Sequence, residues 1–298
     1  MGPSSAQQQA ARALGQTVLL PGDDAWPTAR FLGVNPPPDA LFLRGHLPAP
    51  EAACVAIVGT RNASPYGLRV AAELAAGLVR AGAWVVSGFA LGIDGAAHEA
   101  VIRTGGHTLA VLGCGVDHDY PVAHGDLREE VARTGGLVSE YPPGTEPRRH
   151  HFPRRNRLVA AFAQAVVVVE ASERSGSLIT ARLALELGRD VLAVPGSIHR
   201  RQQRGCHRLL REGASPCCGA EDIQRVLGLR EDVRPTRPPP SDAAEAAVWR
   251  ALDDEEVRDA DGLCLTTGLP AVEVAVALTG LELQGYARRL PGVGFIRA

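Results

Sequence analysis

The sequence predicts an α/β protein, in which a Rossmann-like, doubly wound parallel sheet is followed by a small winged-helix-like domain. Three observations lead to this prediction. Short, continuous apolar runs alternate with segments of helical spacing over residues 51–228, a pattern typical of parallel strands covered by helices on both faces. A proline-rich linker, residues 229–241, then separates this region from the rest of the chain. Residues 242–298 contain two helical segments and a hairpin pattern, the order found in winged helices.

The first fifty residues precede the regular alternation and divide into two parts. Residues 1–17 are rich in Gln, Ala and Ser, which predicts a flexible leader or a single helix. Residues 18–50 contain many prolines, three of them consecutive from Pro36, so we expect an extended lead-in and no helix there. Regular alternation begins only at Val55.

The expected strands and helices follow each other in strict alternation. The strands are expected at Val55–Val58, Trp84–Ser87, Thr108–Leu112, Leu137–Ser139, Ala165–Glu170 and Val191–Val194. The helices are expected at Leu68–Ala81, Gly95–Arg103, Leu127–Thr134, Asn156–Phe162 and Ser177–Leu187, and beyond the linker at Ala244–Leu252 and Ala271–Leu283, before a hairpin over residues 285–296. Doubly wound sheets bind ligands at the carboxyl ends of their strands. The loops at those ends are therefore the place to search for a site.

Composition limits the class of protein and its surroundings. The net charge is −2, and all 31 basic residues are arginine. A biased genome composition accounts for this, although the planar fork of arginine also suits phosphate contact. The six cysteines lack the spacing of a metal site or a disulfide framework, and the apolar runs are too short for a membrane span or a signal peptide. We therefore expect a cytoplasmic protein with no cofactor, no metal and no membrane partner.

Glycine, serine and arginine occupy the loops after the first three expected strands. Glycines let backbone N–H groups approach a phosphate, and the helix that follows adds positive potential. Plain tight turns would explain the glycines alone, but Arg61 favours an anion site. No loop contains the GxGxxG or GxxxxGK[ST] pattern, which disfavours a NAD-dependent oxidoreductase and an NTPase. The candidate ligands are Gly59, Arg61, Ser64, Ser87, Gly88, Gly92 and Gly113.

Two polar residues in the second loop have simpler interpretations. Asp94 is placed to cap the helix that follows it. His98 lies one turn further on, and a lone helical histidine is more often a packed, hydrogen-bonded residue than a catalyst. No nucleophile is paired with His98 by its position in the sequence, so we predict no catalytic residue here.

The strongest indication of a polyanionic partner is the segment 148–157, RRHHFPRRNR. Its five arginines and two histidines surround one aromatic ring, and they repel one another unless an anion offsets the charge. A solvated loop is the plain alternative. Single-stranded nucleic acid requires this mixture, because guanidinium groups bind the backbone and a ring stacks on a base. The candidates are Arg148, Arg149, Phe152, Arg155, Asn156 and Arg157, together with Ser175 and Ser177 of a hydroxyl-rich turn whose simpler role is helix capping.

Charge is distributed unevenly along the chain. Residues 147–211 contain thirteen arginines and four acids, a net charge of +9, whereas residues 242–298 contain five arginines and ten acids, a net charge of −5. An acidic winged helix is poorly suited to a polyanion. Its expected second helix has two glutamates and no arginine with which to read a duplex, which disfavours a transcription factor. We therefore expect the α/β domain to bind DNA.

These loops resemble those of the DNA-processing protein A family (DprA, also called Smf). The resemblance covers about residues 20–228 and rests on ordered motifs: GTRxxSxxG, SGxAxGIDxxAH, VLGxGxxxxYP, SEYP, FPxRNR, VVVVEAxxxSGSLIT, GRxVxAVPG and EGA. It implies a non-enzymatic protein that protects incoming single-stranded DNA and loads the RecA recombinase during natural transformation, competence and recombination. It also implies a pocket lined by Arg61 and the Ser87-Gly88 turn. Arg149 stands where the family often has a lysine.

The resemblance further implies a homodimer formed through the C-terminal part of the α/β domain, with His207, Leu210 and Ile223 expected at the interface. Three features depart from the family. A SAM-like helical domain often precedes the lead-in, where this sequence has at most one helix. Leu91 replaces a frequent basic residue, and the acidic winged helix fits a protein-contact or regulatory role. The alternative from another class is a nucleotide-hydrolysing enzyme of the lysine-decarboxylase-like (LOG) group, but its PGGxGTxxE signature is absent.

Overall fold

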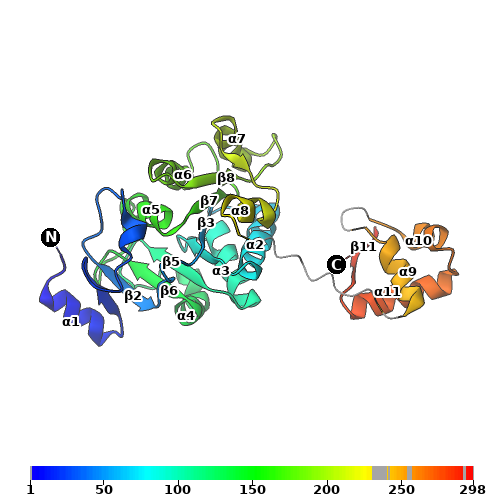
Figure 1. Cartoon of the computed structure of the whole chain (residues 1–298), viewed down its shortest axis with the longest axis horizontal. Coiled ribbons are helices and arrows are strands. Elements are labelled where there is room, and N and C mark those ends of the chain that lie inside the picture. Colours follow the sequence, from blue (N-terminus) through cyan, green and yellow to red (C-terminus); the bar gives the residue numbers. More distant parts are fainter. Residues whose placement is uncertain (1, 230–239, 241, 254–256, 291–292, 298) are drawn as a thin grey trace. The chain divides into compact units, whose positions relative to one another are not determined.

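The protein is described by a computed structural model that covers residues 2–229, 240, 242–253, 257–290 and 293–297. The chain divides into two compact units, Met1–Glu231 and Asp232–Ala298, and Figure 1 labels most of their helices and strands. Apart from residues 229 and 240, the expected proline-rich linker lies outside the described residues. Each unit has a hydrophobic core of its own.

A nine-stranded sheet forms the centre of the larger unit, in the order β1-β2-β6-β5-β4-β3-β7-β8-β9. The seven strands from β6 to β9 in this order run parallel, whereas β1 and β2 are antiparallel additions at one edge. The prediction of a doubly wound, mostly parallel sheet is confirmed. The strands are β1 (Thr17–Leu19), β2 (Leu41–Gly45), β3 (Cys54–Val58), β4 (Trp84–Ser87), β5 (Thr108–Leu112), β6 (Gly136–Ser139), β7 (Ala165–Val168), β8 (Asp190–Ala193) and β9 (Ser215–Pro216).

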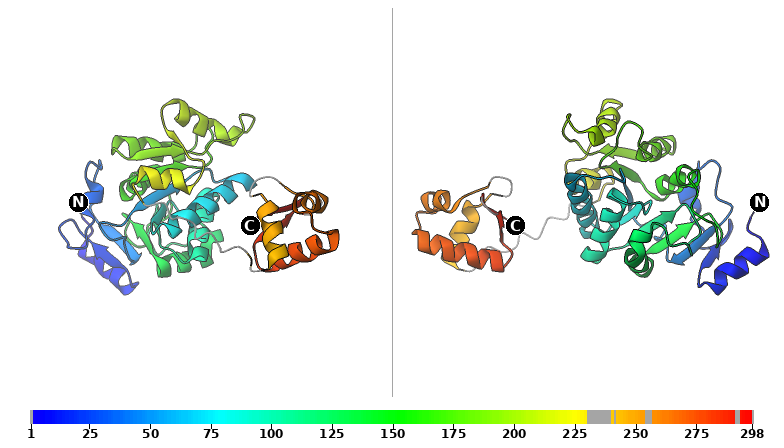
Figure 2. Two further views of the ribbon diagram at one scale, coloured as in Figure 1. Left: turned by 45° about the vertical axis from the view of Figure 1, so that its right-hand side comes forward. Right: turned by 180° about the vertical axis from the view of Figure 1, so that it is seen from behind.

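Helices cover both faces of this sheet (Figures 1 and 2). Alternate residues of β3 enter different core clusters: Ala56 packs with the helices α5 and α6, and Ile57 packs with α2, α3 and α8. This alternation is the geometric consequence of a strand whose successive side chains point to opposite faces. The helices of the unit are α1 (Ser5–Ala13), α2 (Pro65–Arg80), α3 (Ile93–Thr104), α4 (Gly125–Thr134), α5 (His151–Phe162), α6 (Ser177–Glu186), α7 (Arg204–Arg211) and α8 (Ala220–Val226).

The helix and the lead-in that precede the parallel core belong to the fold of the larger unit. Of the two expectations for residues 1–17, the single helix is the one found: α1 begins with a capping box between Ser4 and Gln7. Ala11 of α1 is fully buried. The expected lead-in supplies β1 and β2 to the sheet, and Arg30 of the same segment donates a hydrogen bond of 2.7 Å to the carbonyl of Phe162. The proline-rich composition conceals both strands because they have only three and five residues.

The smaller unit has the predicted winged-helix arrangement. Its described elements are α9 (Ala243–Ala251), α10 (Ala260–Thr267), α11 (Ala271–Leu283) and a hairpin of β10 (Ala287–Leu290) and β11 (Gly294–Arg297). Val248, Leu263 and Leu281 are fully buried in its core. Within the described ranges no single helix is long and apolar enough to cross a membrane; α10 and α11 together meet that test but are bent by 110° at their junction.

His98 is a fully buried histidine of α3 whose tautomer follows from its partner. The Thr108 hydroxyl donates to the carbonyl of Val85 at 2.8 Å, so it must accept from Nδ1 of His98 at 2.7 Å. The interpretation of His98 as a packed, hydrogen-bonded residue is confirmed. Burial, together with the smaller effects of the charges of His124 and Arg155, lowers the pKa of His98 to about 3.

Because the pKa of His98 is lowered in the folded protein, we expect the free energy of unfolding to fall in mild acid. The unfolded chain takes up a proton near pH 6.5 and the folded chain only near pH 3, so the free energy of unfolding falls as the pH drops through this window. Between about pH 7 and about pH 5 we expect His98 to account for about 2 kcal/mol. Urea unfolding of the wild type and of His98→Gln at both pH values measures this contribution. A variant whose stability falls as steeply as that of the wild type would contradict the assignment.

Candidate nucleic-acid interface

A cavity of about 500 Å³ opens at the carboxyl ends of β3, β4 and β7, beside the start of α5. Its position agrees with the rule that open α/β sheets bind ligands at this edge. The cavity brings together nine of the fifteen candidates: Gly59, Arg61, Gly88, Arg149, Phe152, Arg155, Asn156, Ser175 and Ser177. The lining residues that were not among the candidates are Val58, Ala90, Asp94, Tyr120, Pro153, Val159, Gly176 and Thr180.

Phe152 is the aromatic centre of the cavity. The guanidinium carbon of Arg61 lies 5.1 Å from the centroid of its ring, and that of Arg155 lies 6.0 Å away. The ring of Tyr120 lies 5.5 Å from the Phe152 ring, centroid to centroid. Tyr120 belongs to the VLGxGxxxxYP motif, and this motif could have identified it as a residue of the site. An aromatic face bordered by guanidinium groups can stack on a base and hold its phosphate.

The basic segment that carries Phe152 is helical. The helix α5 begins at His151, five positions before the expected start, so most of the segment is helical and the plain alternative of a solvated loop fits only residues 148–150. Pro153 is the third residue of the helix, within the first turn, where a missing N–H costs no hydrogen bond. Because helical side chains point in different directions, the arginines of the segment have different surroundings.

Arg149 and Arg148 precede α5, and both side chains are exposed. Arg149 lines the cavity and Arg148 does not. Gly113 lines a smaller adjoining cavity of about 50 Å³. A Cβ atom at Gly113 would lie 2.9 Å from Cδ1 of Phe152, so this glycine gives the Phe152 ring room to lie against the loop.

Arg155 forms the floor of the cavity, where it is buried. It donates to the carbonyl of Gly88 at 2.8 Å and to the carbonyl of Val111. Asp94 accepts from the N–H groups of Gly88 at 3.1 Å and of Ala90 at 3.2 Å. Burial lowers the pKa of Arg155 to about 10, with Asp94 opposing the shift. Burial also raises the pKa of Asp94, and Arg155 opposes it. The two side chains therefore fix the Gly88 turn.

The expected capping role of Asp94 is wrong, because the N-cap of α3 is Gly92 and Asp94 lies inside the first turn. Gly92 has a φ of +81°. A Cβ atom there would lie 2.4 Å from the carbonyl oxygen of Thr60 and 2.7 Å from that of Arg61. Gly92 therefore does not line the cavity, but it permits the close approach that holds the Arg61 loop in place.

Two of the candidate serines form hydrogen bonds inside the protein and do not line the cavity. The hydroxyl of Ser64 donates to the buried carboxylate of Glu170 at 2.6 Å, and its oxygen accepts from the N–H of Gly67 at the start of α2. The hydroxyl of Ser87 donates to the carbonyl of Ile57 at 2.6 Å. Both serines are buried, so they shape the loops and are not available as direct ligands.

Ser175 and Ser177 keep their hydroxyl groups at the cavity. Their oxygens lie 2.7 Å apart. The N-cap of α6 is Gly176, which has no side-chain cap, but the hydroxyl oxygen of Ser175 accepts from the N–H of Ser177, the first residue of α6, at 3.4 Å. Ser175 therefore supports the start of the helix, and Ser177 does not cap it.

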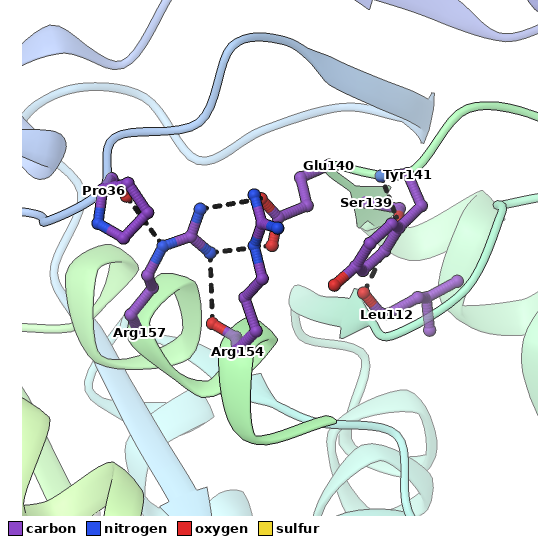
Figure 3. A network of polar contacts seen from close by, with 7 residues as sticks. All are labelled: Pro36, Leu112, Ser139, Glu140, Tyr141, Arg154 and Arg157. Carbon is purple, nitrogen blue, oxygen red and sulfur yellow. Dashed lines mark hydrogen bonds and ion pairs between the residues drawn. The ribbon is translucent and has the colours of Figure 1, made fainter. Parts of the chain in front are cut away.

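Arg157 is buried away from the cavity, which corrects its assignment as a DNA contact (Figure 3). Its guanidinium donates two hydrogen bonds to Glu140, at 2.8 and 2.7 Å, and Nε donates to the carbonyl of Pro36 at 2.8 Å. The side chains of Arg157 and Glu140 are each 5% exposed. Arg154 lies 3.4 Å from the same carboxylate but is 56% exposed. The ion pair thus fastens α5 to the loop after β6 and to the lead-in.

One of the three expected dimer residues is also misplaced. Ile223 is fully buried in the core between α8 and α2, so its side chain cannot face a partner. His207 is half-buried, with Nε2 3.0 Å from the carbonyl oxygen of Gly196, and Leu210 is half-buried against the core. In the part of the chain that the structure describes, no group of three or more His, Cys, Asp or Glu side chains is arranged to hold a metal ion.

Comparisons with known proteins identify the family. Residues 17–228 match the family described as DNA recombination-mediator protein A, and residues 233–293 match the DprA winged helix domain. The chain belongs to the DprA/Smf family. The prediction made from the ordered motifs is therefore confirmed.

Two curated members of the DprA/Smf family illustrate the degree of similarity. A DNA processing protein DprA of Mycobacterium tuberculosis is 42% identical over 293 residues, which cover 92% of this chain and 75% of the relative. The protein Smf of Escherichia coli is 37% identical over 288 residues, which cover 94% of this chain and 77% of the relative.

Solved structures of DprA proteins share the fold. DprA from Streptococcus pneumoniae has a TM-score of 0.70 at 38% identity, covering 75% of this chain and 78% of that protein. DprA from Helicobacter pylori has a TM-score of 0.62 at 30% identity, covering 71% of this chain and 95% of that protein, and its structure is described in terms of its single-stranded DNA binding mode.

Proposed function

We propose that this protein binds single-stranded DNA in the cavity between Arg61, Arg149 and Phe152. The observation that carries the proposal is the Arg61 guanidinium 5.1 Å from the Phe152 ring, at the sheet edge where α/β folds bind ligands. A single strand offers free base faces for the ring and phosphates for the arginines. In a duplex the bases are stacked inside and cannot reach Phe152. The single-stranded DNA binding of the Helicobacter pylori relative supports the same conclusion.

Through this binding, the protein would protect incoming single-stranded DNA and load RecA recombinase during natural transformation and recombination. It would act in the cytoplasm as a non-enzymatic homodimer, associating through the C-terminal part of the α/β domain. Membership of the DprA/Smf family supports this role. The surroundings of Asp94 support the non-enzymatic part, because this carboxylate accepts two backbone N–H groups and faces Arg155. A carboxylate held in this way is poorly placed to act as a nucleophile or general base.

Fluorescence anisotropy with a labelled oligo-dT and a matched duplex tests the proposal. We expect clear preference for the single strand, and an affinity that falls with salt by a slope of about 0.7 per phosphate contact on logarithmic axes. Equal affinity for the duplex would contradict the proposed site. The rate of RecA filament formation on the same oligonucleotide, with and without the protein, tests the loading step.

A further inference from the structure

A second group of arginines lies next to the cavity along the same edge of the sheet. Arg174 belongs to the loop after β7. Arg200 and Arg201 lie between β8 and α7, and Arg204 is the first residue of α7. We call these four residues the arginine strip. All four side chains are exposed. Because β7 and β8 are neighbouring parallel strands, the loops after them meet at the same sheet edge.

Backbone hydrogen bonds join the arginine strip to the rim of the cavity. The N–H of Ala171 donates to the carbonyl of Gln202 at 2.7 Å, and the N–H of Gly205 donates to the carbonyl of Ala171 at 2.8 Å. A Cβ atom at Gly205 would lie 2.7 Å from that same oxygen, so the start of α7 is pressed against the loop. Four residues after Ala171, the loop reaches Ser175, which lines the cavity.

The arginines of the strip differ from other arginines on the neighbouring helices in their ion pairs. Arg182 on α6 and Arg208 on α7 have glutamate partners, at 3.4 and 3.5 Å. Within the described residues, no ion pair involves any of the four arginines of the strip. Glu173 is the acid nearest to them in sequence, and it leaves the group with a net positive charge. Exposed cations grouped in this way attract a polyanion.

The size of the cavity indicates that a bound single strand extends beyond it and can itself be this polyanion. A volume of about 500 Å³ accommodates roughly one ligand of nucleotide size. A longer strand must therefore leave the cavity over its rim. The rim loop contains Arg174, Ser175 and Gly176. It lies beside the segment after β8, to which the hydrogen bonds of Ala171 join it.

We propose that a single strand held in the cavity continues over the rim loop and binds the arginine strip through its phosphates. The inference rests on the proposed function and extends it, because it assigns a second set of contacts to the same strand. These contacts are sequence-independent, since guanidinium groups on phosphates carry no base information. The length of the strand should therefore determine its affinity.

The full chain and a strip variant test this inference with two labelled oligo-dT probes, of about six and about twenty nucleotides. The strip variant combines Arg174→Gln, Arg200→Gln, Arg201→Gln and Arg204→Gln. The matched control also removes four exposed arginines, each in the last turn of a helix: Arg80→Gln, Arg103→Gln, Arg133→Gln and Arg225→Gln. Light scattering checks that both variants keep the molecular mass of the wild type, because the strip adjoins His207 and Leu210.

We expect the strip variant to bind the short probe like the wild type and the long probe at least tenfold more weakly. Its salt slope on the long probe should fall by about 3, since each lost phosphate contact accounts for about 0.7. The control variant should bind both probes like the wild type. A strip variant with wild-type affinity and slope on the long probe would overturn the inference and leave the cavity intact. A wild type that binds neither probe would instead refute the proposed function itself.

Discussion

Replacing Arg61 and Arg149 together with alanine is expected to weaken the binding of oligo-dT about a hundredfold or more. Hydrogen bonds to charged groups contribute about 1.5–3 kcal/mol each when a partner is removed, and both guanidinium groups line the cavity beside Phe152. Both side chains are exposed, so their loss should change the free energy of unfolding by less than about 0.5 kcal/mol. Fluorescence anisotropy measures the affinity, and urea unfolding confirms that the variant is folded.

The matched control is the double variant Arg80→Ala and Arg103→Ala, which removes two exposed arginines from the ends of α2 and α3. It should bind oligo-dT as tightly as the wild type. If the Arg61 and Arg149 variant also binds like the wild type, the strand is held elsewhere on the protein. The winged-helix unit would then be the first alternative to test.

The variant Arg157→Ala is expected to have the opposite pattern, with a large loss of stability and unchanged binding by the folded molecules. Removing one partner of a buried ion pair costs about 3–5 kcal/mol, because the other charge remains buried. Among the described residues, the ion-pair partner left to Glu140 would be the exposed Arg154, at 3.4 Å. Urea unfolding measures the loss, and anisotropy at low urea measures the affinity of the folded fraction.

A double variant separates the contribution of the two charges to stability from the contribution of side-chain packing. Arg157→Met combined with Glu140→Met removes both charges and retains most of the volume, so it should recover a large part of the lost stability. Binding of oligo-dT should again be unchanged. An Arg157→Ala protein that is as stable as the wild type but no longer binds the strand would return Arg157 to the list of DNA contacts.

The sequence predicts the sheet well because buried parallel strands appear as continuous apolar runs. Runs such as Thr108–Leu112 coincide with the strands of the structure, and the glycine-rich and arginine-rich loops fall at the carboxyl edge that forms the cavity. The antiparallel strands β1 and β2 are missed because runs of three and five residues among prolines do not establish a period. Local pattern therefore predicts the parallel core but not the strands added to its edge.

The site is predicted less completely, because a run of charge does not reveal which charges are buried. Arg155 and Arg157 lie two positions apart on α5, and both are buried beside carboxylates from distant parts of the chain, Asp94 in the first turn of α3 and Glu140 in the loop after β6. Only the fold brings these carboxylates to the helix. Arg149 and Phe152 do line the cavity, because Arg149 lies just before α5 and Phe152 in its first turn, where the helix meets the edge of the sheet.

The sheet ends in very short strands on both sides, three residues in β1 and two in β9. Unpaired edge strands are templates on which other chains add strands and aggregate. At β9 the template is almost absent, because one of its two residues is Pro216, which has no N–H to offer. Two copies of the protein are therefore not expected to join their sheets through the β9 edge. An association at the β9 end would rely on side chains more than on backbone pairing, and side-chain contacts can be specific for one partner in a way that backbone pairing is not.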